Sequence, residues 1–197
     1  MSRLHYYAAM TFLVASLFVL VGHGLARSGP ELVVTPNVQA PAPTPPAAGP
    51  VGWFQAMKPY CNTVEVEVAL KNNPAPEGTE GVAYAAACLA LAGRIDGARE
   101  AIAGLPVAER PRAAGVVFDV AHPIADAGDD RSAGPIMGLV VEFWPDHYMA
   151  LYHAGMADYA LGHRASARSL LQRFLVEYHE ADGWRSNAEH VLAELAR

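Results

Sequence analysis

The chain lacks the clusters of basic residues with which proteins displace counterions from nucleic acids. Of its 197 residues only 17% are charged, and the formal net charge is −6. It also lacks a phosphate-binding glycine loop and a Gly-x-Ser-x-Gly nucleophile element. These absences argue against nucleic acid as a partner, and no pattern in the sequence argues for catalysis or for a bound cofactor.

Cysteine is scarce as well, since the sequence contains two, Cys61 and Cys88. In an exported chain these two thiols can oxidise to a disulfide. Such a bridge would close a loop of about 27 residues and stabilise the fold by about 3 kcal/mol in the chain-entropy model. Two buried thiols acting as small hydrophobic side chains fit the sequence equally well, because it does not give the Cα–Cα distance.

The eight histidines form no recognisable metal-ligand pattern. His147 and His153 are six residues apart, which places them on different faces of a helix, and no neighbouring cysteine or acidic residue completes a tetrahedral set. Asp126, Asp129 and Asp130 lack the alternating spacing of a calcium loop. Capping of the following helix is their expected role, and the sequence predicts no metal site.

Residues 1–26 have the features of an export signal. Arg3 precedes an apolar run, and Gly24-Leu25-Ala26 supplies small residues of the kind that a signal peptidase recognises. Two interpretations fit, a signal peptide cleaved after Ala26 and an uncleaved signal anchor from Tyr6 to Leu25. The chain is therefore expected to be exported, either to the periplasm or to the periplasmic face of the inner membrane, with membrane contact through this segment if it is uncleaved.

Proline and alanine dominate residues 27–50. Proline at this density removes backbone donors and favours polyproline II, so this segment is expected to be a disordered, semi-rigid linker. The composition becomes aromatic and aliphatic at Val51. A single folded domain is therefore expected over 51–197.

Two short helices are expected before residue 79. The first is indicated by four residues at helical spacing, Trp53, Phe54, Met57 and Tyr60. Residues 63–68 alternate with a period of two, which by itself indicates a strand, but a lone strand has no partner in a helical protein. A cap at Asn62 or Thr63 instead fits the start of a second helix. The residues that follow this cap at helical spacing are Val64, Val68 and Lys71.

The dominant feature of the chain is a glycine, an alanine five residues later and a large apolar residue four residues after that. The pattern occurs three times, as Gly93, Ala98 and Ile102, as Gly128, Ala133 and Met137, and as Gly162, Ala167 and Leu171. Glycine suits a tight turn between helices, alanine suits a close helix crossing, and the large residue fills the space beside it. A period of 34 or 35 residues indicates helical hairpins that bury their faces by stacking.

This pattern resembles the tetratricopeptide repeat (TPR) family, with repeats at about 79–113, 114–147 and 148–181. The resemblance implies an all-α fold, a right-handed solenoid of helical hairpins with an N-terminal helical hairpin. A C-terminal cap helix is expected over 184–196, with Ser186 or Asn187 near its start. The signature tryptophan is missing from all copies, and Pro123 is expected to kink or split the first helix of the middle copy.

The resemblance also implies a binding surface, because the first helices of TPR hairpins line a concave groove. The family's groove positions fall here on Ala83, Ala87 and Ala90 and on a partner-binding set, Phe118, His122, Asp126, Met149, Tyr152, Met156 and Tyr159. This surface is apolar and has no basic clamp for a peptide carboxylate. The same residues are equally compatible with packing between helices, or with burial under the chain's own cap helix or N-terminal segment.

The implied function is a non-catalytic protein–protein interaction scaffold of the bacterial-type cell envelope that captures a peptide or helix of a protein partner in the groove. One alternative is a structural accessory subunit of an envelope complex that binds through its convex face or self-associates. A further alternative is a cell-wall enzyme or carbohydrate-binding helical-repeat protein.

Overall fold

The computed structural model describes residues 49–197. The expected export signal and nearly all of the expected linker lie outside these residues. Every regular element from residue 49 onward is helical, which confirms the all-α prediction and shows that the strand alternative for 63–68 is wrong. Within the same residues no helix has both the length and the apolar character required to cross a bilayer.

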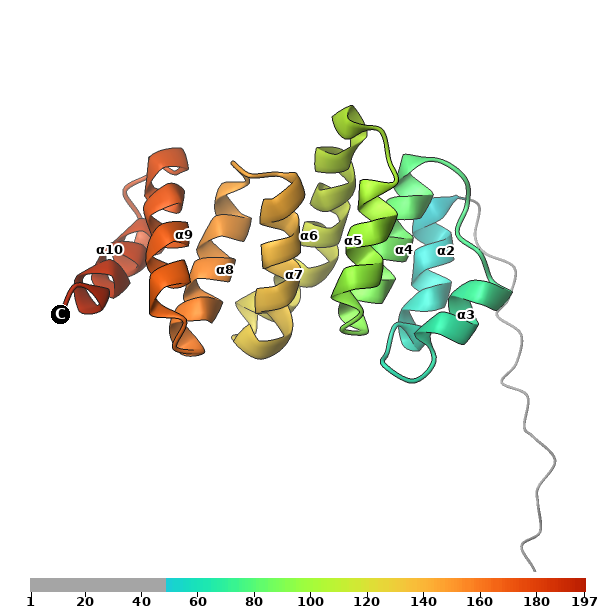
Figure 1. Cartoon of the computed structure of the whole chain (residues 1–197), viewed down its shortest axis with the longest axis horizontal. Helices are drawn as coiled ribbons and strands as arrows, with labels where there is room; N and C mark the ends of the chain where they lie inside the picture. Colours follow the sequence, from blue (N-terminus) through green and yellow to red (C-terminus); the bar gives the residue numbers. More distant parts are fainter. Residues whose placement is uncertain (1–48) are drawn as a thin grey trace, which may run out of the picture. The chain divides into compact units, whose positions relative to one another are not determined.

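The described part of the chain contains nine α-helices and two 3₁₀ helices. The α-helices are α2 (Pro50–Met57), α3 (Val66–Asn72), α4 (Thr79–Leu91), α5 (Ile95–Ala103), α6 (Arg110–Asp126), α7 (Asp130–Phe143), α8 (Tyr148–Ala160), α9 (Arg164–Glu177) and α10 (Gly183–Leu195). The 3₁₀ helices are η1 (Lys58–Tyr60) and η2 (Val107–Glu109). From α4 to α10 each helix packs on the next one in the sequence, and α4 also packs on α6 (Figure 1).

The hairpins α4–α5, α6–α7 and α8–α9 close with the same backbone turn. The φ angles are 74°, 77° and 82° at Gly93, Gly128 and Gly162. In the first hairpin the amide of Gly93 donates to the Ala90 carbonyl and the amide of Arg94 donates to the Leu89 carbonyl. These two bonds define a Schellman motif, and both recur at the other two turns. The left-handed conformation explains why glycine recurs at this position.

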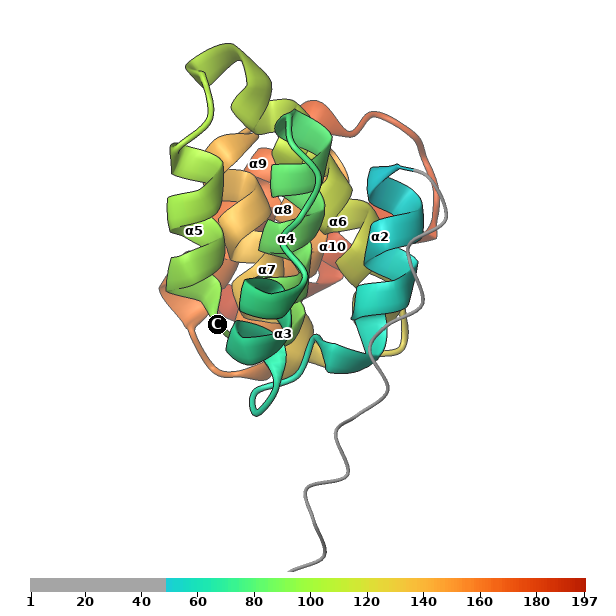
Figure 2. The ribbon, with the colours of Figure 1, turned by 90° about the vertical axis from the view of Figure 1, so that its right-hand side faces the viewer.

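The alanine and the large residue of each copy lie in the second helix of its hairpin, and all six side chains are buried. Their predicted packing role is therefore confirmed. Viewed along the row of helices, α5 lies on one side of α4 and α2 lies on the other (Figure 2). α2 packs on α4 at one end, and α10 packs on α8 and α9 at the other.

Helix α6 differs from expectation at both ends. It begins at Arg110, before the expected start of the second repeat at 114, with Pro111 in its first turn. The Arg110 guanidinium donates to the carbonyls of Ala103 and Leu105 at 2.7 and 3.0 Å. It also continues through Pro123 to Asp126, so the prediction of a split helix is wrong. Pro123 lies in the last turn, where the missing N–H removes a single backbone bond.

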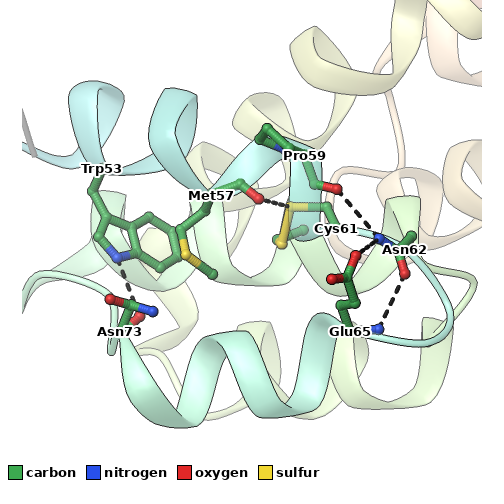
Figure 3. Close-up of a disulfide and its surroundings, with 8 residues drawn as sticks. Trp53, Met57, Pro59, Cys61, Asn62, Glu65 and Asn73 are labelled. Atoms are coloured by element: carbon green, nitrogen blue, oxygen red, sulfur yellow. Dashed lines mark hydrogen bonds between the residues drawn. A yellow bond between two sulfur atoms is a disulfide. The ribbon is translucent and has the colours of Figure 1, made fainter. Parts of the chain in front are cut away.

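The segment before α4 is held by a cap and a disulfide (Figure 3). The Oδ1 atom of Asn62 accepts from the amides of Val64 and Glu65 at 3.0 and 3.1 Å, so Asn62 starts the turn that leads into α3. Cys61 and Cys88 are joined by a disulfide, with their Cα atoms 4.8 Å apart. Of the two states compatible with the sequence, the structure contains the bridge.

The valines at helical spacing after the cap do not mark the buried face of this segment. Val64 and Val68 are exposed to solvent, whereas Val66 and Ala69 are buried. The cap at Asn62 determines where the helical segment begins, whereas packing on α4 determines which of its side chains face the interior. Ala69 and Val66 therefore face the interior although the helical spacing from Asn62 favoured the other valines.

The C-terminal helix occupies the predicted range, and Ala188, Val191 and Leu195 are buried along one face. Neither Ser186 nor Asn187, which were expected to help start it, is its N-cap. The N-cap is Asp182, whose carboxylate accepts from the amides of Trp184 and Arg185 at 3.0 and 3.2 Å. Accepting these bonds and one from the Tyr178 hydroxyl holds the pKa of Asp182 below its usual value, with the hydroxyl as the largest cause.

Two glycine-to-alanine substitutions are expected to change the free energy of unfolding in opposite directions, because one glycine lies at a helix crossing and the other does not. A Cβ at Gly155 would lie 2.8 Å from Cγ and Cδ2 of the fully buried Leu171, so Gly155→Ala is expected to lower the free energy of unfolding by about 1–3 kcal/mol. A Cβ at Gly138 of α7 meets no atom within 4 Å, so Gly138→Ala is expected to raise it by about 0.5–1 kcal/mol. Urea unfolding followed by circular dichroism checks both, and equal effects would contradict the α8–α9 crossing.

Candidate functional site

The predicted groove residues lie on two helices. Phe118, His122 and Asp126 belong to α6, and Met149, Tyr152, Met156 and Tyr159 belong to α8. The two helices meet through their rings, because the centroids of His122 and His153 are 5.0 Å apart and those of Phe118 and His147 are 4.2 Å apart. The predicted set is therefore brought to one region of the fold.

Two members of this set are interior residues. Phe118 is 8% exposed and Tyr152 is 5% exposed, so neither side chain is available as a direct contact for a partner. The three alanines assigned to the groove in the first repeat, Ala83, Ala87 and Ala90, are also buried. All five residues pack between helices, which is one of the arrangements that the sequence left open.

The cap helix α10 contacts the α8 part of the set. The Asn187 side-chain amide donates to the Tyr152 hydroxyl at 2.7 Å, and the Trp184 ring packs edge-on against Tyr152 with centroids 4.9 Å apart. Farther along α8, the Tyr159 hydroxyl donates to the carboxylate of Glu194. The chain's own C-terminal helix thus occupies this end of the predicted groove.

Helix α6, the first helix of the middle hairpin, lies between the two first helices on which the end helices α2 and α10 pack. α2 packs on α4, where the rings of Phe54 and Tyr84 stack with centroids 5.0 Å apart, and α10 packs on α8. Exposed carboxylates on α6 are those of Asp119 and Asp126. Within the predicted set Asp126 is exposed, and four side chains are half-buried, those of His122, Met149, Met156 and Tyr159.

A cluster of two histidines and one aspartate lies between α6 and α8. His122 and Asp126 are one helical turn apart on α6, and the Nε2 atom of His122 is 3.4 Å from Oδ1 of Asp126. His153 of α8 presents its Nε2 atom to the same oxygen at 3.6 Å. The three ligand atoms all lie within 4.8 Å of one another.

The nitrogens of this cluster are not hydrogen-bonded. Neither the Nε2 atom of His122 nor that of His153 has a hydrogen-bond partner among residues 49–197, and both atoms are buried. The separations of 3.4 and 3.6 Å from Asp126 exceed the usual N–H···O range of about 2.7–3.2 Å. A buried polar atom left without a partner costs about 1–3 kcal/mol.

Burial sets the protonation state of His153. The side chain is 6% exposed, and this desolvation, together with the neighbouring His122, lowers the pKa of His153 to about 4 against the opposing effect of Asp126. His153 is therefore a neutral imidazole at pH 7.

Aromatic rings surround the cluster. Phe118 stacks on His122 with centroids 4.7 Å apart, and the edges of Tyr152 and Trp184 meet His153 at 5.4 and 5.7 Å. The nearby His147 caps α8, since its Nδ1 atom accepts from the amide of Ala150 at 3.2 Å, and burial lowers the pKa of His147. Each cluster histidine therefore has at least one aromatic ring packed against it.

Sequence reasoning missed the role of His153. In the sequence no neighbouring acidic residue completes a tetrahedral set with His147 and His153, but in the fold Asp126 approaches His153 from α6. His122 and His153 are 31 residues apart, about one helical turn short of the repeat period, which places them on consecutive first helices. Repeat register was therefore the signal that could have found the pair.

Among the acidic residues near this turn, Asp129 acts as expected. Asp129 is the N-cap of α7, and its Oδ1 atom accepts from the amide of Ser132 at 3.2 Å. Capping is therefore confirmed for Asp129, whereas Asp126 faces the histidines. Comparisons of the chain with protein-family models, with curated proteins and with solved structures found no match.

Proposed function

We propose that this chain is a TPR-like solenoid that serves as a non-catalytic protein–protein interaction scaffold of the bacterial-type cell envelope. The observation that carries the proposal is the recurrence of one Schellman turn and one buried alanine–large pair in α4–α5, α6–α7 and α8–α9. Hairpins that share a turn and a packing pair stack in register and present a row of equivalent helix faces. Such a row suits an extended peptide or a helix as its partner.

The partner surface in this proposal is centred on α6. Asp119 is exposed, and after burial and Glu80 its charge adds to the rise in the pKa of Tyr84 on α4. Met149 adds a half-buried apolar side chain at the start of α8. A peptide or helix that pairs an apolar side chain with a basic one fits this combination.

The disulfide supports the exported location. Bridges such as Cys61–Cys88 persist in oxidising compartments and are rare in the reducing cytosol. Export of the folded domain agrees with the signal-like character of residues 1–26. A periplasmic or membrane-tethered scaffold is the location that both features favour.

Site-specific photo-crosslinking in cells tests the partner surface. A photoreactive residue in place of Asp119 or Met149 is expected to form covalent adducts with a second protein, because both positions lie on the proposed surface. The matched control is Val176 of α9, which is 66% exposed and lies on a second helix. Adducts from position 176 without adducts from 119 and 149 would contradict capture on α6 and favour an accessory subunit that binds through the second helices.

A further inference from the structure

We propose that His122, Asp126 and His153 form a binding site for a divalent transition-metal ion such as Zn²⁺, held between α6 and α8. The inference goes beyond the scaffold function. It concerns the isolated chain, so its test does not depend on any partner.

The ligand set selects the class of ion. Two imidazoles and one carboxylate suit Zn²⁺, Co²⁺, Ni²⁺ and Fe²⁺, whereas Ca²⁺ and Mg²⁺ take oxygen ligands. Three protein ligands are the number found in zinc sites that keep one position open. The open position would take a water molecule or a donor atom from a bound molecule.

The spacing of the ligand atoms fits a small ion. In a tetrahedral site with bonds of about 2.0 Å, neighbouring ligand atoms are about 3.3 Å apart. The two nitrogen–oxygen separations here are 3.4 and 3.6 Å, and the nitrogen–nitrogen separation is within 4.8 Å. The ring of His122 is partly exposed, so a small rotation of that ring would bring its nitrogen closer to the nitrogen of His153.

An independent observation points to a missing ligand. The Nε2 atom of His153 is buried, faces the cluster and has no hydrogen-bond partner in the described residues. Buried polar atoms in native proteins are satisfied in the large majority of cases. One Asp126 oxygen cannot satisfy two nitrogens at these distances, whereas a metal ion would bind both nitrogens and the carboxylate.

The surroundings hold the ligands and leave a path for the ion. His122 and Asp126 are fixed one turn apart on a helix, and Phe118 stacks on the His122 ring. Tyr152 and Trp184 pack on His153. The Asp126 side chain is 48% exposed, so solvent reaches the cluster on that side.

The test is metal binding to the full chain, purified in mild detergent and stripped with a chelator. Calorimetric titration with Zn²⁺ is expected to give one ion per chain. Loss of an outer-shell partner weakens metal binding by about 10–100-fold, and loss of a ligand in Asp126→Asn is expected to weaken it by at least about 100-fold. The matched controls are His163→Gln and His190→Gln, because both histidines are exposed and contact carboxylates outside the cluster.

Two further readouts separate ligation from folding. Asp126 is exposed enough for Asp126→Asn to keep the apo melting temperature, and Zn²⁺ is expected to raise that temperature in the wild type and not in the variant. Co²⁺ in the site is expected to show the intense visible bands of four- or five-coordination. Equal Zn²⁺ affinity in wild type and Asp126→Asn, loss of binding in either control, or a cobalt spectrum like that of the hydrated ion would each overturn the proposal.

Discussion

Replacement of Phe174 by alanine is expected to lower the free energy of unfolding by about 3–5 kcal/mol. Phe174 of α9 is fully buried, and its ring packs against Tyr152 of α8 and against Tyr178, with centroids 5.1 and 5.0 Å away. The Tyr178 hydroxyl in turn donates to Asp182, the N-cap of α10. A cavity at Phe174 therefore removes packing within the α8–α9 hairpin and loosens the start of the helix that follows.

Urea unfolding measured by circular dichroism checks this value against two matched variants. Phe174→Leu retains a large apolar side chain and is expected to cost about 1–2 kcal/mol. Val176→Ala changes an exposed residue of the same helix and is expected to stay within about 0.5 kcal/mol of the wild type. If Phe174→Ala were no worse than Val176→Ala, the packing of α8 on α9 described above would be incorrect.

The hairpins were predictable because their determinants are local. Gly128 closes its turn through bonds to residues of the preceding helical turn, and Ala133 and Met137 share one face of the next helix at a spacing of four. Each of these constraints acts within about ten residues and repeats three times, so the sequence pattern carries them directly.

The surroundings of those hairpins were not predictable in the same way. Tyr152 occupies the position of a groove residue, yet Asn187 and Trp184 of α10 cover it from 30 or more residues away. Transfer of groove positions from a family assumes that no other helix of the chain covers the first helix of each hairpin. Whether the face of a first helix stays accessible depends on contacts with helices far away in the sequence. A repeat of local sequence features does not encode those contacts.

The candidate site combines both kinds of information. The His122–Asp126 pair follows from helical spacing, and both residues were in the predicted binding set. The third member, His153, required the register between consecutive first helices and the packing of Trp184. Sequence reasoning therefore located the region of the site and missed the contact that defines its chemistry.

Loss of the Cys61–Cys88 disulfide is expected to lower the free energy of unfolding by about 3 kcal/mol, because the bridge closes a loop over a sequence separation of 27 residues. The enclosed helix α3 is also held by an ion pair between Glu67 and Arg94 and by a hydrogen bond from the Trp53 indole to the Asn73 carbonyl, both at 3.2 Å. It buries Val66 and Ala69, and beside it Arg94 donates to the Thr63 carbonyl at 3.2 Å. The bridge adds a covalent link to these contacts.

The double variant Cys61→Ala/Cys88→Ala, compared with the wild type in urea with and without reductant, measures this contribution. Reduced wild type and the variant should unfold at the same urea concentration, and reductant should leave the variant unchanged. Hydrogen exchange should be faster in α3 (Val66–Asn72) than in the wild type while exchange in α8 stays near its original rate, since local opening begins where buried contacts are fewest. Equal stability of oxidised and reduced wild type would show instead that the packing of Val66 and Ala69 suffices to hold this segment.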